Sequence, residues 1–165
     1  MTSRKPSEDL RVEVWMRDLS PPPGDPRKNV LSRLRAFEAE GFVDEVSVRV
    51  WGKNVTVSRE EDDEGRTVIR ERVSEFQRWA ERNGHSLEPA FRWRDQSSMV
   101  SEGGNEVIRL PLQCLAVYAD DNLVAVFPCS MNGETNTVGD CLARLEMGDF
   151  DRIQKERETG PSDRA

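Results

Sequence analysis

The alternation of apolar and polar residues predicts two strands in the first third of the chain. Apolar residues occupy every second position over 10–16, with Arg, Glu and Trp between them, and valines do the same over 46–50. This two-residue period is typical of strands that bury one face. After the second strand the period shifts by one position, to Val55 and Val57, which predicts a turn or bulge at 52–54.

Between these strands, an apolar stripe at helical spacing predicts a helix. Asp25 is placed to cap its first turn, Pro26 suits the first helical position, and Gly41 suits its end. The stripe consists of Val30, Leu31, Leu34 and Phe37.

The rest of the chain adds two helices and three strands. A second apolar stripe predicts a helix over 66–83, and a strand follows around 90–93. Two apolar runs, 107–118 and 123–128, predict a buried hairpin. A capping box at Thr137 and the apolar residues after it predict a last helix that ends near Met147.

This order of elements indicates an α+β fold, in one compact domain with two parts. The first part, 10–57, is a strand-helix-strand unit, either winged-helix-like or a split α/β unit. The second part, 58–150, is a helix, an antiparallel three-strand sheet and a helix. The polar ends, 1–9 and 151–165, are predicted to be disordered tails.

Charge and composition narrow the function classes. The 165 residues include 31 acidic and 24 basic ones, with a net charge of −7. Only four of the basic residues are lysines, at positions 5, 28, 53 and 155. An acidic, arginine-rich chain suits a cytoplasm rich in salt, which indicates a halophilic host. The chain has neither an apolar run that could span a membrane nor a secretory signal, so we expect a cytoplasmic protein without a membrane partner.

The first helix and the strand after it are the candidate DNA-binding surface. The net negative charge argues against phosphate binding in general, but the first third of the chain has a slight excess of basic residues. A basic helix followed by a strand resembles the recognition helix and wing of a winged helix-turn-helix, although a strand and a proline-rich loop stand where its other helices belong. The candidate contacts to double-stranded DNA are Lys28, Arg33, Arg35, Arg49, Trp51 and Lys53.

The outward face of the first two strands is an alternative interface. If these strands pair, Arg11, Trp15 and Trp51 lie on one sheet face, where they could bind a protein partner, a second copy of the chain or a small ligand. The competing interpretation is that the rest of the chain covers this face and that both tryptophans belong to the core.

The three cysteines and the single histidine offer little catalytic or metal chemistry. Cys114, Cys129, Cys141 and His85 lack the short spacings of a structural zinc site, so no metal is expected. Cys129 follows an apolar strand and precedes a polar loop and a helix start, which would suit a reactive thiolate if His85 served as its base. The simpler interpretation is that Cys129 is a small buried residue.

Four segments together resemble a family of haloarchaeal proteins labelled as helix-turn-helix-domain or uncharacterised proteins. They are VEVWMR at 12–17, PPPG at 21–24, VRVWGK at 48–53 and the apolar run between two cysteines at 114–129. The resemblance spans nearly the whole chain between the tails. It implies a haloarchaeal host and DNA binding, and it supplies no site residues. From all these observations we expect a non-enzymatic, DNA-binding transcriptional regulator without a cofactor.

Overall fold

The computed structural model describes residues 9–18, 23–56, 64–95 and 106–148. Apart from Asp9, the predicted tails lie outside the described residues. Within them, helices and strands combine in an α+β fold, which confirms the fold class predicted from the sequence. No helix in the described part of the chain is long and apolar enough to cross a membrane.

A four-stranded sheet forms the centre of the fold. Its strands are β1 (Leu10–Met16), β2 (Glu45–Val50), β6 (Gln113–Ala119) and β7 (Asn122–Phe127), in the order β2-β1-β6-β7. β1 pairs in parallel with β2 and antiparallel with β6, and β6 forms a hairpin with β7. The first strand of the chain therefore lies inside the sheet, held by a strand from the second half.

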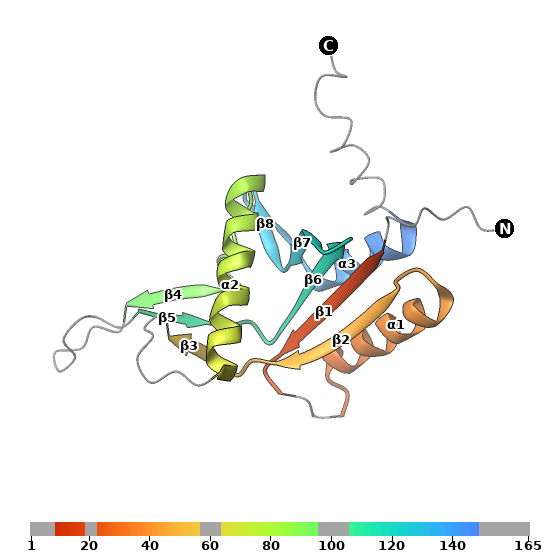
Figure 1. Cartoon of the computed structure of the whole chain (residues 1–165), viewed down its shortest axis with the longest axis horizontal. Helices are drawn as coiled ribbons and strands as arrows, with labels where there is room; N and C mark the ends of the chain where they lie inside the picture. The colour runs from red at the N-terminus through yellow and green to blue at the C-terminus, as the bar shows by residue number, and fades with distance from the viewer. Residues whose placement is uncertain (1–8, 19–22, 57–63, 96–105, 149–165) are drawn as a thin grey trace, which may run out of the picture.

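The three helices lie on the two faces of this sheet. They are α1 (Pro26–Glu40), α2 (Glu64–Asn83) and α3 (Val138–Met147). α1 connects β1 to β2 and contacts α3, which contacts β6. α2 lies on the opposite side of the sheet from α1 (Figure 1). Both faces of the central strands are thereby covered, and every residue of β6 is buried.

The helix ends follow the predicted local signals. The Asp25 side chain accepts a hydrogen bond from the Arg27 backbone N–H at 2.9 Å, and Gly41 ends α1 in the left-handed conformation, with φ 88°. At α3, Thr137 and Asp140 form a reciprocal capping box. These contacts involve neighbours in the sequence, which is why residue type alone identified them.

β1 presents different residues to the two helix layers. Val12 and Val14 alternate with Glu13 and Trp15, so the two pairs lie on opposite faces. The buried Glu13 carboxylate accepts hydrogen bonds from the Arg72 guanidinium of α2 at 2.9 and 3.0 Å. It also accepts one from Trp15 Nε1 at 2.9 Å. The face of β1 that carries Glu13 and Trp15 is therefore packed against α2.

A second sheet projects beyond α2 (Figure 1). It contains β3 (Asn54–Thr56), β4 (Arg92–Asp95) and β5 (Glu106–Arg109), in the order β3-β5-β4. Residues 51–53 separate β2 from β3, where a turn was predicted at 52–54, and Gly52 has a φ of 78°. β2 and β3 thus belong to different sheets.

Two predictions about strands are corrected by the structure. The run 107–118, predicted as one strand, is divided between β5 and β6 by residues 110–112. Pro111, which has no N–H to donate, lies at this break. The polar segment after β7, predicted as a loop, contains a hairpin of β8 (Cys129–Met131) and β9 (Glu134–Asn136). Because most residues of this hairpin are polar, the sequence shows no alternation of apolar and polar positions there.

Candidate nucleic-acid interface and cysteine pocket

The three basic residues predicted on α1 lie at the surface, but two of them have acidic partners. Arg33 is 3.3 Å from the Glu146 carboxylate, and Arg35 is 3.1 Å from that of Glu38. Arg35 also donates a hydrogen bond to the Val46 carbonyl at 3.2 Å. These carboxylates interrupt the positive surface that a recognition helix would need.

The other predicted DNA contacts lie elsewhere. Arg49 shares a sheet face with its register partner Trp15, and its guanidinium is 5.4 Å from the centre of the Trp15 ring. This is the α2 side of the sheet, so Arg49 does not join the residues of α1. Lys53 is exposed and directly precedes β3. Trp51 is only 3 % exposed, which excludes it as a surface contact.

The arrangement around α1 also differs from a recognition helix and its wing. The wing of a winged helix is formed by an antiparallel pair of strands. Here β2, the strand after α1, pairs in parallel with β1, while β3 belongs to the second sheet. The first part of the chain therefore contains a β-α-β crossover at the edge of the central sheet.

The prediction that Trp15 and Trp51 form an interface is wrong, because both rings belong to the core. Trp15 and Trp51 stack with centroids 5.4 Å apart, as neighbouring strands predict, but they are 1 % and 3 % exposed. Phe91 packs edge-on against Trp51, whose Nε1 donates to the Pro111 carbonyl at 3.2 Å. Arg11 pairs with Asp121 at 3.4 Å. The competing interpretation, that other parts of the chain cover this face, is the correct one.

The second sheet carries basic residues that were not among the predicted DNA contacts. Arg92 and Arg94 are both exposed and, two positions apart on β4, lie on one face of the sheet. Arg109 of β5 is the register partner of Arg92 and shares that face. The Lys53 carbonyl accepts a hydrogen bond from the Leu110 backbone N–H next to Arg109. Lys53 thus lies one position away from Asn54, the register partner of Arg109, and strand alternation does not place it on this face. We call Arg92, Arg94 and Arg109 the basic sheet surface.

No residue of the basic sheet surface forms an ion pair within the described residues. The charge of Arg109 in this surface also affects the pKa of the nearby Arg17. Burial first, and then the charges of Arg109 and Arg27, lower the pKa of Arg17. The alternation Arg92-Trp93-Arg94 was the signal in the sequence, but the pairing with Arg109 depends on the strand register.

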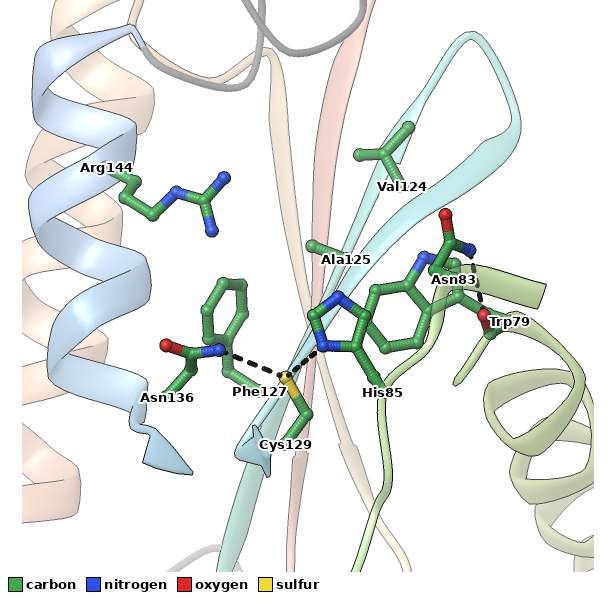
Figure 2. A pocket seen from close by; sticks show the side chains of 9 residues that line it. All are labelled: Trp79, Asn83, His85, Val124, Ala125, Phe127, Cys129, Asn136 and Arg144. Carbon is green, nitrogen blue, oxygen red and sulfur yellow. Dashed lines mark hydrogen bonds between the residues drawn. The ribbon is translucent and has the colours of Figure 1, made fainter. Parts of the chain in front are cut away.

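A pocket opens between the central sheet, α2 and α3, next to Cys129 (Figure 2). It has a volume of about 100 Å³. His85 Nδ1 lies 3.8 Å from Cys129 Sγ, and the His85 ring stacks on Trp79 with centroids 4.8 Å apart. Asn136 Nδ2 donates to Cys129 Sγ at 3.8 Å, and Arg144 lies on the α3 side. The structure thus brings together the cysteine and histidine that the sequence could only propose as partners.

The Cys129 thiol is not set up as a thiolate. Burial raises its pKa, and the hydrogen bond from Asn136 and the charge of Arg144 oppose this only in part. Burial also raises the pKa values of Cys114 and Cys141, both of which are fully buried. The described residues contain no group of three or more His, Cys, Asp or Glu side chains placed to hold a metal ion.

A family model described as a helix-turn-helix domain matches residues 4–149. Neither the curated proteins nor the solved structures give a match. In the described part of the chain, strands separate consecutive helices: β2 and β3 lie between α1 and α2, and β4 to β9 lie between α2 and α3.

Proposed function

Because the chain belongs to this helix-turn-helix domain family, we propose that it is a regulatory protein that binds double-stranded DNA and has no enzymatic activity. We further propose a cytoplasmic location in a halophilic archaeon. The acidic, arginine-rich and lysine-poor composition supports this host, because arginine keeps strong contacts with phosphate when salt screens weaker charges.

The basic sheet surface supports DNA binding more strongly than α1 does. Arg92 and Arg109 lie directly opposite each other on paired strands, an arrangement in which like charges repel. Neither has an acidic partner within the described residues. A phosphate backbone would relieve this repulsion, since phosphate contacts supply most of the affinity of non-specific DNA binding.

Strands rather than a recognition helix would then make the main contact. Antiparallel strands are an established means of entering a groove or following the backbone. The alternative is the surface predicted from the sequence, formed by Lys28, Arg33 and Arg35 on α1. The ion pairs with Glu146 and Glu38 weaken it, because those carboxylates would face the same phosphates.

Two charge-matched double variants distinguish the surfaces. Arg92→Glu/Arg109→Glu changes the basic sheet surface, and Arg33→Glu/Arg35→Glu changes α1. Each replaces two arginines by two glutamates, so the change in net charge is the same. Binding to a fluorescently labelled duplex of mixed sequence is followed by anisotropy over a series of KCl concentrations, after circular dichroism has shown that both variants fold.

We expect the first variant to weaken binding more than the second. Because each phosphate contact contributes about 0.9 to the slope of log K against log salt, losing two contacts should reduce the slope by about two. A larger effect of the α1 variant would show that α1, and not the basic sheet surface, contacts the DNA. Failure of the unchanged protein to bind DNA at low salt would refute the proposed function.

A further inference from the structure

The Cys129 pocket has the size and lining of a site for a small molecule. Its volume of about 100 Å³ is smaller than the cavity of about 150 Å³ that accommodates benzene in an engineered protein. The pocket therefore suits a ligand smaller than benzene. The lining comes from α2, β7, β8, β9 and α3, and from His85 just after α2.

The polar atoms that line the pocket favour an anion. Arg144 brings a guanidinium from the α3 side, and Figure 2 shows it directed toward the sheet above Phe127. Asn136 lines the pocket beside Cys129, and Trp79 lines its α2 side. None of the described residues that line the pocket is an aspartate or glutamate. A cation would therefore find no counter-charge there.

The buried indole N–H of Trp79 is the feature that indicates a bound ligand. The residue is 3 % exposed, and its Nε1 has no hydrogen-bond partner. Figure 2 shows this nitrogen at the side of the pocket near Val124 and Asn83. Leaving a buried donor unsatisfied is costly, and such groups are rare in folded proteins. An acceptor oxygen of a bound molecule would satisfy it.

We propose that this pocket binds a small carboxylate with a second acceptor oxygen, of the 2-oxo or 2-hydroxy acid class. The carboxylate pairs with Arg144, as charge-assisted hydrogen bonds to guanidinium groups favour. The second oxygen accepts the hydrogen bond of Trp79 Nε1. The ligand thereby bridges α2 and α3, which lie on opposite sides of the pocket.

Cys129 and His85 shape the wall between these two groups. The raised pKa of Cys129 keeps its thiol neutral at neutral pH, so the thiol does not repel an anion. The stacking of His85 on Trp79 fixes the indole plane and hence the direction of its N–H. None of these residues belongs to the basic sheet surface, so ligand binding in the pocket does not depend on DNA binding.

The indole N–H signals in a ¹H–¹⁵N NMR spectrum provide the test. Sodium pyruvate is titrated into the full chain up to about 100 mM, a range that includes millimolar dissociation constants, and sodium chloride of equal ionic strength serves as the blank. The Trp79 signal is assigned with the variant Trp79→Phe. We expect it to move downfield and to saturate, while the signals of the other tryptophans move less.

The variant Arg144→Gln should weaken pyruvate binding about tenfold or more, the loss expected for one charge-assisted hydrogen bond. The matched control is Arg78→Gln, which removes an exposed arginine of α2 outside the pocket and should leave binding unchanged. Acetate, which lacks the second oxygen, should bind more weakly than pyruvate. No saturable shift, an unchanged affinity in Arg144→Gln, or equal binding of acetate would each overturn the proposal.

Discussion

Removing the cation that pairs with Glu13 should destabilise the protein strongly. In Arg72→Met, the carboxylate loses both hydrogen bonds from Arg72 and keeps the one from Trp15 Nε1. The Glu13 side chain is 6 % exposed, so its charge stays in the core. Breaking a buried pair in this way costs about 3–5 kcal/mol. Since the Arg72 side chain is 27 % exposed and its loss admits water, we expect the lower end, about 3 kcal/mol.

Urea unfolding, followed by tryptophan fluorescence, measures the change in the free energy of unfolding. For a chain of this length, the same loss lowers Tm by about 6–12 °C. Arg78→Met on the exposed side of α2 is the matched control, and it should cost less than about 0.5 kcal/mol. Methionine and arginine have similar helix propensities, so this difference does not arise from the helix itself.

The complementary variant, Glu13→Gln, tests whether loss of the Glu13 carboxylate costs less stability than loss of the Arg72 guanidinium. The amide can still accept a hydrogen bond, and the partly exposed Arg72 can turn to water, so the cost should be smaller, about 1–2 kcal/mol. A cost of Arg72→Met equal to that of Arg78→Met would refute the reasoning. It would show that water or another group satisfies Glu13 without Arg72.

Three further predictions follow from local contacts. Thr137→Ala should lower the free energy of unfolding by about 1 kcal/mol, because it removes the cap of α3; an unchanged urea midpoint would contradict this. Hydrogen bonds from the Arg27 side chain and backbone lower the pKa of Asp25 to about 2, so their contribution to stability is complete above about pH 4 and is lost as the pH falls toward 2. Asp25→Asn should remove this pH dependence, which acid titrations of both proteins would reveal. Iodoacetamide should modify Cys129 faster than the two fully buried cysteines, and equal rates by mass spectrometry would rule this out.

The sequence alone determined the features that depend on near neighbours. Asp25, Pro26 and Gly41 marked the ends of α1, and Thr137 marked the start of α3. The two-residue period identified β1 and β2, and it placed Trp15 and Trp51 near each other. Steric limits and hydrogen bonds within a few residues of the chain are sufficient for such features.

Only the tertiary structure decided which faces are covered and which distant residues meet. The period of β1 is the same whether Trp15 faces water or α2, and the bond between Glu13 and Arg72 settles this point. Cys129 and His85 are 44 residues apart in the chain and adjacent in the fold. Such contacts depend on how strands from both halves pair and how helices pack on them, because the free energy of burial depends on the whole assembly and not on a local pattern.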